Sequence, residues 1–513
     1  MGAAGSAPTP RQAVAQHRRA AAAAAAAAPR RTEPQPEALD EKFSLAMSLT
    51  SSGSAKVADG AHVNASKTLE WVEELLQDPK NRLALSALST TNPSSVLEIP
   101  STVLRDTQHF SLAIPSEGTP VTNQRSSGRC WIFAATNVFR IALMKTYDLP
   151  AFELSQSYLF FWDKVEKANY FLESILATTD EQVDSRVIGA LMSSPVGDGG
   201  QWDMIANLVG KYGLVPQALY PDSWNAMNSR TMDSLITTKL REDALRLRHL
   251  VGKGADKASV QKAKDGMMQD VVRILTLTLG PPPAADKKFT WEFYDKAGKL
   301  KVVEKSPLEF AGSLGDSRAV RACGGTDVHE LFSLVNDPRN EYFSLLTVDK
   351  LGNVWGGRPI TYVNVDSRTL KKAAVEMIRK GFPVFFGSDV GKFSDSAKGI
   401  MDVKLVDYEL GFNVRLGMSK AQRLMTGESA MTHAMVLTAV HLDDEGNSVR
   451  WRVENSWSES AGDHGYFVAS DAWMDEFCYQ AVVDPSVVAS DVTDVLKQKP
   501  KVLPLWDPMG ALA

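Results

Sequence analysis

Cys130 is the first candidate for chemistry in this sequence, which contains only three cysteines. It lies in the stretch NQRSSGRCWIFAATNVFR, between small, flexible residues and an apolar run. A helix that begins at Cys130 would present unpaired N–H groups and partial positive charge to the sulfur, and both stabilise a thiolate. This placement favours a nucleophile. The alternative is a buried core cysteine, because free thiols are among the most buried side chains.

A nucleophilic cysteine needs a base, and His433 is the best placed of the eight histidines. It opens the apolar strand HAMVLTAV, which would hold the imidazole rigidly, although an isolated histidine there could also be structural. Asn455 follows 22 residues later in VENSW. Its amide could accept a hydrogen bond from one ring nitrogen and direct the other at the sulfur, as in a catalytic triad.

Gln124 completes the predicted site, six residues before Cys130. Its side-chain N–H could stabilise an oxyanion together with the backbone N–H of Cys130. Each of these signals is weak alone, but Gln-x5-Cys-Trp, a strand-borne His and Asn-Ser-Trp in this order predict a cysteine hydrolase. No Cys/His cluster has metal-ligand spacing, so we expect neither a metal nor an organic cofactor.

The composition is that of a soluble globular protein. The 513 residues are 44% hydrophobic and 23% charged, with a formal net charge of -5, which favours neither a nucleic-acid binder nor a membrane protein. The longest apolar run, Ala20 to Ala28, is too short to span a bilayer. Three widely separated cysteines make no disulfide framework, so we expect a reducing, intracellular compartment.

The N-terminal segment has a composition of its own. Residues 1–31 contain arginines and many alanines but no acidic residue, which is typical of a mitochondrial transit peptide. The start MGAAGS also fits the N-myristoylation pattern. A disordered tail with no address is the third alternative. We treat residues 1–65 as a targeting or linker segment outside the folded part.

The elements that must position these residues change in type along the chain. Helical spacing is predicted over residues 67–78, 130–146, 156–178, 234–251 and 258–279. A glycine-rich loop over 193–204 opens a further helix, and KFTWEFYD predicts a strand. After residue 361 short strands with turn residues between them indicate a curved antiparallel sheet. The fold class is therefore α+β.

These motifs resemble the bleomycin hydrolase (aminopeptidase C) branch of the papain-like cysteine peptidases. The runs that carry the resemblance are PVTNQRSSGRCWIFAATN, ELSQSYLFFWDKVEKAN, GDGGQWDM, FFGSDVGK, THAMVLTAV and VENSW. SGRCW departs from the papain pattern C-G-[SA]-C-[WY], and the 303 residues from Cys130 to His433 are roughly twice the papain interval. Ser458 stands where papain-like enzymes usually have Gly after Asn-Ser-Trp.

The resemblance implies a division of the chain. In this division the folded chain consists of four parts: a papain-like helical half (66–225), an inserted, mainly helical oligomerisation block (226–345), a β-barrel-like half (346–500) and a C-terminal tail in the active-site cleft (501–513). It also implies Cys130 as nucleophile, His433 as general base and then acid, and Asn455 as the residue that orients the imidazole. Further implied residues are Gln124 in the oxyanion hole and Gly199, Gly200, Trp457 and Ala513 in substrate binding.

The implied activity is a cysteine aminopeptidase. The carboxylate of Ala513 would pair with the α-ammonium of a peptide with a free N-terminus, and the enzyme would also hydrolyse bleomycin and homocysteine thiolactone. The family forms hexamers and we expect a cytoplasmic location, with a mitochondrial one as an addition. Residues 230–305 carry 16 basic and 10 acidic residues and could also bind DNA weakly by counterion release. A plain papain-like endopeptidase and a nucleic-acid-binding scaffold are the alternative functions.

Overall fold

The computed structural model describes residues 63–316 and 330–512. The chain divides into two compact units, residues 1–83 and 84–513. The targeting segment expected over residues 1–31 and the expected carboxylate of Ala513 lie outside the described residues. Within the described ranges, no helix combines the length and apolarity that a membrane span requires. The boundaries expected at residues 225, 345 and 500 all fall inside the second unit and remain predictions.

The described part of the first unit is helical. Helix α3 (Ala65–Gln77) coincides with the helix predicted over 67–78. It begins at Asn64, whose side chain accepts hydrogen bonds from the backbone N–H groups of Ser66 and Lys67. Helix α4 (Pro79–Leu88) begins in this unit, and its last residues belong to the second unit.

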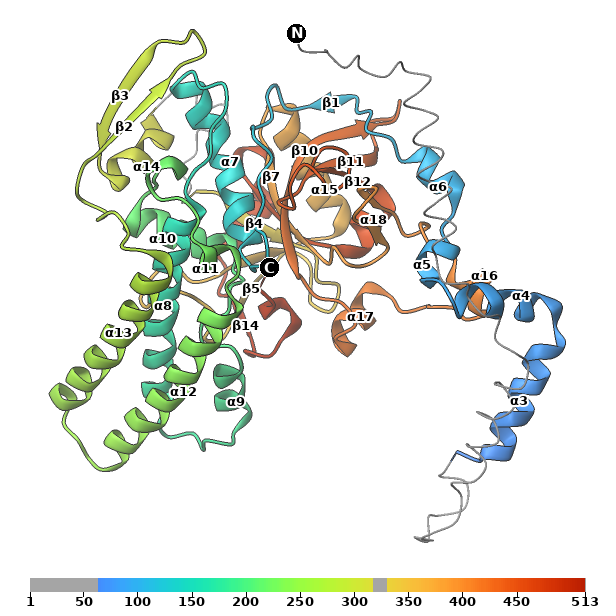
Figure 1. Ribbon diagram of the computed structural model, residues 1–513, viewed down its shortest axis with the longest axis horizontal. Helices are drawn as coiled ribbons and strands as arrows, with labels where there is room; N and C mark the ends of the chain where they lie inside the picture. Colours follow the sequence, from blue (N-terminus) through green and yellow to red (C-terminus); the bar gives the residue numbers. More distant parts are fainter. Residues whose placement is uncertain (1–62, 317–329, 513) are drawn as a thin grey trace, which may run out of the picture. The chain divides into compact units, whose positions relative to one another are not determined.

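Helix α7 (Cys130–Thr146) is the central helix of the second unit, and it covers the range that the sequence predicts. Nearly all its residues are buried, because it packs against α8 (Gln156–Leu176) on one side and against the sheet on the other. An apolar composition all round the helix is what such a position requires. Figure 1 shows α7 between the green helices and the orange strands. The other helices of this layer are α9 (Arg186–Ser193), α10 (Trp202–Tyr212), α11 (Trp224–Met227), α12 (Arg230–Gly252), α13 (Lys257–Leu279) and α14 (Pro307–Asp316).

A twelve-stranded sheet forms the other layer, with the order β14-β5-β6-β4-β13-β7-β10-β11-β12-β9-β8 and with β1 paired to β10. Its central strands pair antiparallel, as the sequence predicts. Three parallel pairs, β4 with β6, β5 with β14 and β9 with β12, were not predicted. The strands are β1 (Leu112–Ala113), β4 (Phe332–Val335), β5 (Ser344–Val348), β6 (Tyr362–Asn364), β7 (Val384–Ser388), β8 (Ser394–Asp395), β9 (Ile400–Met401), β10 (His433–Leu442), β11 (Ser448–Glu454), β12 (Tyr466–Ser470), β13 (Cys478–Val483) and β14 (Lys501–Leu503).

Both faces of the central strands are buried. Along β10, Ala434 and Val436 contact the core that contains α7, whereas Met435 and Leu437 contact a second core beneath α15 (Ser367–Arg379) and α18 (Asp471–Phe477). A strand covered on both sides reads as a continuous apolar run, which is why HAMVLTAV shows no polar alternation. Helix α15 was not expected from the sequence. The α+β class itself is confirmed.

The block expected to be an insertion contains the long helices α12 and α13, which pack on α8, and the hairpin of β2 (Phe289–Tyr294) with β3 (Leu300–Lys305). These agree with the two helices and the strand that the sequence predicts there. The remaining short helices of the second unit are α5 (Pro93–Val96), α6 (Pro100–Arg105), α16 (Tyr408–Phe412), α17 (Lys420–Thr426) and α19 (Ser490–Asp494).

Candidate active site

Cys130 is the first residue of α7, and its side chain is almost fully buried at 2% exposure. No side chain caps this end of the helix, so its first N–H groups remain directed at the site. Backbone N–H groups of Ala434, Trp131 and Cys130 itself stabilise a negative charge on the sulfur. Since Ala434 follows His433 in β10, the structure brings the predicted nucleophile to the strand end that carries the predicted base.

The hydrogen bonds of Asn455 fix the tautomer of His433. Asn455 Oδ1 accepts from the backbone N–H of Ser456 at 2.8 Å, which identifies this atom as the amide oxygen. The same oxygen lies 2.9 Å from His433 Nε2. Nε2 must therefore carry the hydrogen, and in the neutral ring Nδ1 is the nitrogen with a free lone pair. The imidazole is thus left with Nδ1 to accept a proton.

Burial disfavours a single charge on either group of the pair. It raises the pKa of Cys130 to about 11, against the lowering effect of the backbone N–H groups. It lowers the pKa of His433 to about 4, against the raising effect of the hydrogen bond to Asn455. Transfer of the thiol proton to His433 creates both charges at once, so that each stabilises the other.

The lowered pKa of His433 leads to a pH prediction. An imidazole must be unprotonated to act as base, so kcat/KM should stay near its plateau as the pH falls through 6.5 and decline only toward pH 4 to 5. The hydrogen bond to Asn455 raises this pKa, so Asn455→Ala should move the acid limb to still lower pH. We expect its loss of turnover to be smaller than the general-base contribution of about 10²–10⁴.

A pH profile of kcat/KM with a neutral-side-chain peptide measures both effects. An acid limb at or above pH 6.5, or an Asn455→Ala limb displaced upward, would contradict the role given to this hydrogen bond. His441→Ala is the matched control, because His441 lies at the far end of the same strand.

Gln124 is held by two side-chain hydrogen bonds. Its Oε1 accepts from Ser456 Oγ at 2.7 Å, and its Nε2 donates to the backbone oxygen of Ser127 at 2.6 Å. An amide nitrogen has two hydrogens, so one remains for an oxyanion. The side chain is 7% exposed and is locked in orientation before any substrate arrives.

Backbone hydrogen bonds join the Gln124 loop to the Asn-Ser-Trp segment. The N–H of Gln124 donates to the oxygen of Ser456 at 2.9 Å, and the N–H of Ser458 donates to the oxygen of Thr122 at 3.1 Å. Ser458 adopts a φ of 73°, in the left-handed region that favours glycine. The departure from glycine in the sequence therefore leaves the turn in place, with the strain of a side chain in this conformation.

The residues predicted to bind substrate lie in two places. The ring of Trp457 packs against His433 with centroids 4.9 Å apart and so covers the imidazole. Gly199 and Gly200 belong to the glycine-rich loop over 193–204 and lie beside Trp131. A Cβ on Gly200 would come within 2.4 Å of the Trp131 ring, so only glycine allows this approach.

The described part of the C-terminal tail returns to this glycine loop. Ala511 accepts a hydrogen bond from Gln201 Nε2 at 2.8 Å, and Gln201 directly follows Gly200. Met509 is buried, and Asp507 pairs with Arg339 at 2.8 Å. These contacts fix the tail as far as residue 511 next to the loop.

Several residues around the site were not predicted from the sequence. Ser456 orients Gln124, and the buried ammonium groups of Lys164 and Lys167 donate to backbone oxygens of the glycine loop. The run FFWDKVEKAN contained a signal for the lysines. They lie three residues apart on a helix that is mostly buried, and a buried lysine must find a partner.

The site contains no cluster that would bind a metal. Among the residues that the structure describes, no group of three or more His, Cys, Asp or Glu side chains has the arrangement of a metal site. Cys130 and Cys478 are both free thiols, and Cys323 lies outside the described residues. The arrangement of thiol, imidazole, amide and oxyanion donor is suited to nucleophilic attack on a carbonyl carbon.

The chain is similar to known proteins over most of its length. Residues 62–510 match the Peptidase C1-like family. The chain is 42% identical over 461 residues to cysteine proteinase 1, mitochondrial, of Saccharomyces cerevisiae (strain JAY291), which covers 88% of this chain and 93% of that protein. It is 43% identical over 464 residues to bleomycin hydrolase of Rattus norvegicus, which covers 89% and 100%. The crystal structure of PepW from Lactobacillus rhamnosis is similar with a TM-score of 0.83 and 40% identity, over 88% of this chain and 100% of that one.

Proposed function

The chain belongs to the Peptidase C1-like family and is a cysteine peptidase, and we propose that it is an aminopeptidase of bleomycin hydrolase type. The observation that supports this most directly is the constellation at the start of α7. Buried Cys130 accepts from the backbone N–H of Ala434, and the preceding residue of β10 is His433, whose Nε2 lies 2.9 Å from Asn455 Oδ1. The return of the tail to the glycine loop supports the exopeptidase mode.

The proposed reaction begins with proton transfer from Cys130 Sγ to His433 Nδ1. The sulfur attacks the scissile carbonyl carbon, and the oxyanion that forms accepts hydrogen bonds from Gln124 Nε2 and the backbone N–H of Cys130. The imidazolium then gives its proton to the leaving amine as the C–N bond breaks, which leaves a thioester on Cys130. Water attacks this thioester while His433 accepts its proton, and the returning proton restores the thiol.

Selectivity for a free N-terminus is proposed to come from the tail. Ala511 is held beside Gln201, and we propose that the carboxylate of Ala513 enters the cleft next to this contact. A carboxylate there would pair with the α-ammonium of a substrate and would block the space that a longer peptide needs. A charge-assisted hydrogen bond of this kind contributes about 1.5–3 kcal/mol, or about 10–150-fold in kcat/KM.

Conversion of the C-terminal carboxylate of Ala513 to an amide tests this proposal. The tail keeps its bulk but loses its charge, so kcat/KM for a peptide with a free N-terminus should fall about 10–150-fold while the N-acetylated peptide stays poor. Deletion of Ala513 alone keeps the buried Met509 and moves the carboxylate back by one residue. We expect a similar loss on free peptides and a gain on acetylated ones.

Hydrolysis of matched free and N-acetylated peptides measures the selectivity, and Gln201→Ala is an intermediate case that releases the oxygen of Ala511. If the preference for free N-termini were unchanged in the amidated and the shortened enzyme, the tail would not set it. A plain endopeptidase would cleave the acetylated peptide efficiently from the outset.

The proposed substrate class includes small amides and activated carbonyls besides peptides. Two of the compared proteins carry names that refer to a peptidase activity and to bleomycin hydrolysis, respectively. The thioester mechanism acts on any unhindered carbonyl with a leaving group that His433 can protonate. We therefore propose bleomycin and homocysteine thiolactone as further substrates.

A homohexamer is the proposed assembly, with contacts made by the inserted helices. Helices α12 and α13 expose Leu235, Leu245 and Leu277, the last at 80%. Many of their basic side chains are already neutralised within the chain, for example in the pairs Lys239–Asp243 and Arg273–Asp270. This favours protein contact over DNA, although weak DNA binding by the remaining positive charge stays part of the proposal.

The proposed location is the cytoplasm, with mitochondria as a second compartment. The yeast relative is named as mitochondrial. The acid-free composition of residues 1–31 supports an import signal in this chain also.

A further inference from the structure

We propose that Asp198 is a positioning residue for the nucleophile. It forms hydrogen bonds with residues on both sides of Cys130 and so fixes the turn over residues 128–131, which we call the nucleophile turn. This inference rests on the proposed function, in which Cys130 is the nucleophile. Asp198 precedes the two glycines of the loop and comes from a part of the sequence remote from Cys130.

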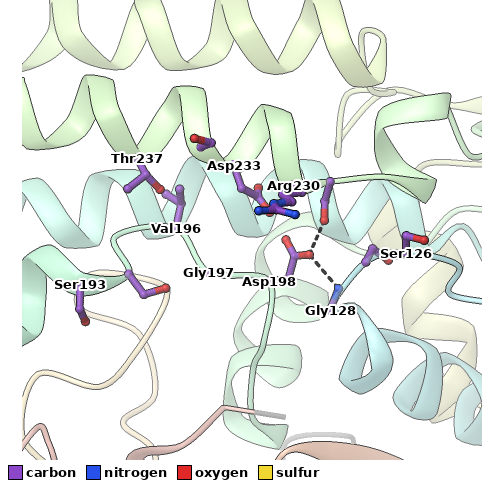
Figure 2. Close-up of a pocket in the computed structure, with 13 residues that line it drawn as sticks. Ser126, Gly128, Ser193, Val196, Gly197, Asp198, Arg230, Asp233 and Thr237 are labelled. Atoms are coloured by element: carbon purple, nitrogen blue, oxygen red, sulfur yellow. Dashed lines mark hydrogen bonds between the residues drawn. The ribbon is translucent and has the colours of Figure 1, made fainter. Parts of the chain in front are cut away.

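Two hydrogen bonds join Asp198 to the turn. Its carboxylate Oδ2 accepts from the backbone N–H of Gly128 at 2.8 Å, and its backbone oxygen accepts from Trp131 Nε1 at 2.7 Å. Gly128 is two residues before Cys130 and Trp131 is the residue after it, so the two bonds bracket the nucleophile. Figure 2 shows the carboxylate of Asp198 directed at Gly128.

The contact between the two segments is too close for any side chain at residue 128. A Cβ built on Gly128 would lie 2.7 Å from the Cβ of Asp198. The backbone of Gly128 is therefore packed directly against the side chain of Asp198, with no space for a Cβ between them. This packing limits how far the turn can shift. Misplacement of a reacting group by about 1 Å can cost about 10²-fold in rate.

Groups from α8 and from the start of α12 stabilise the negative charge of Asp198. Oδ1 accepts from Lys164 Nζ at 2.6 Å and Oδ2 accepts from Ser229 Oγ at 2.6 Å. Burial alone would raise the pKa of Asp198, but Lys164 and hydrogen bonds from Asp233, Lys164 and Ser229 hold it well below the ordinary range. The carboxylate is thus ionised throughout the working range of a peptidase and is a strong acceptor for Gly128.

Asp233 is the carboxyl group of this pair that binds a proton more readily. Burial raises the pKa of Asp233 to about 7, Lys164 lowers it, and the hydrogen bond and charge of Asp198 raise it further. Its Oδ1 lies 2.6 Å from Lys164 Nζ, so Lys164 bridges the two acids. If Asp198 were replaced by Asn, Asp233 could ionise and keep Lys164 paired, but an amide oxygen facing Gly128 would place the amide NH2 against the Lys164 ammonium, so the amide restores only part of the carboxylate's contacts.

The negative charge of Asp198 also acts on the thiol, because it raises the pKa of Cys130. The other charged groups around Asp198 are Lys164 and Lys167 from α8 and Arg230 and Asp233 from α12. Arg230 and Asp233 line the cavity of about 430 Å³ beside the turn that Figure 2 displays. Replacement of Asp198 should therefore change the geometry of attack and the pKa of the thiol together. A residue that only stabilises the fold would not change both.

The test compares Asp198→Asn and Asp198→Ala with the unmodified full-length chain. Iodoacetamide alkylation of Cys130, followed by mass spectrometry across pH 5–11, gives the pH midpoint of thiol ionisation. Steady-state kinetics with a peptide that has a free N-terminus give kcat and KM. For Asp198→Asn we expect the alkylation midpoint to move to lower pH. For Asp198→Ala we expect the same direction and a fall in kcat of about 10²-fold with KM changed by less than about threefold. Asp198→Asn should recover part of this kcat, because the amide oxygen can still accept from Gly128.

Asp243→Asn is the matched control, since Asp243 is a buried carboxylate on α12 that pairs with Lys239. It should lower thermal stability without moving the alkylation midpoint. Variants at residue 198 with an unchanged midpoint and unchanged kcat would overturn the proposal. So would a loss of kcat in Asp198→Ala that tracks the loss in melting temperature and that Asp243→Asn reproduces. Failure of the proposed function would appear separately, as an unmodified chain that hydrolyses no peptide or reacts at Cys478 before Cys130.

Discussion

Replacement of Cys130 by serine is expected to lower kcat for peptide hydrolysis by about 10⁶-fold, the loss found when the nucleophile of a triad is removed. The physical reason is the weakness of the base. Burial lowers the pKa of His433 to about 4, and an imidazole of this basicity withdraws a proton from an alcohol far less readily than from a thiol. His433→Ala should cost nearly as much. The double variant should be little worse than either single one, because the two groups act as a unit.

Cys478→Ser is the control that this chain offers. Cys478 is also 2% exposed, and burial raises its pKa to about 11 as well, but it begins β13 and lies in the core on the opposite side of the sheet. We expect nearly full activity from this variant. Single-turnover assays with purified protein measure the activity of each variant, and a thermal melt shows whether a loss of activity reflects a loss of stability. Substantial activity in Cys130→Ser, or its loss in Cys478→Ser, would contradict the assignment.

Gln124→Ala is expected to lower kcat by about 10²–10³-fold with little change in KM, the usual effect of removing one oxyanion donor. The effect falls on kcat because the free N–H of Gln124 meets full negative charge only after attack by the sulfur. Ser456→Ala should produce a smaller loss, since it frees Oε1 of Gln124 but leaves the donor in the site.

Gln156→Ala supplies the comparison for Gln124. Gln156 is buried at 2% exposure in α8, and its Nε2 lies 3.3 Å from Thr136 Oγ1, away from the carbonyl site. Steady-state kinetics of the three variants should therefore rank Gln124→Ala lowest in kcat and Gln156→Ala close to the unmodified enzyme. Normal turnover in Gln124→Ala would remove this residue from the oxyanion hole.

The parts of the fold and site that the sequence predicted are those with a local signal. Helix α7 begins at Cys130, as expected, because a flexible SSG stretch meets an uninterrupted apolar run there. His433 begins β10 because a strand buried on both faces leaves a continuous apolar pattern that has a clear start. The hydrogen bond between His433 and Asn455 was predicted from residue types and order, and the structure contains it.

The parts that were not predicted depend on contacts between distant segments. Nothing near Asp198 in the sequence indicates that its carboxylate meets Gly128 70 residues away, or that Lys164 neutralises it. Helix α15 has a clear amphipathic pattern, but it lies among short strands that suggested a purely β-rich segment. The parallel strand pairs likewise join segments that are not neighbours along the chain, so pattern alone does not specify them.

The pairing of the Gln124 loop with the Asn-Ser-Trp segment has a consequence for the time at which activity appears during synthesis. Gln124 is 332 residues from Ser456 in the sequence, although the two side chains are hydrogen-bonded. A ribosome releases Cys130 early and His433, Asn455 and Ser456 late, so under the proposed mechanism a nascent chain carries its nucleophile without its base or its oriented oxyanion donor. We therefore expect the proposed activity to appear only when translation is almost complete, so that an unfinished chain has no peptidase activity toward its neighbours.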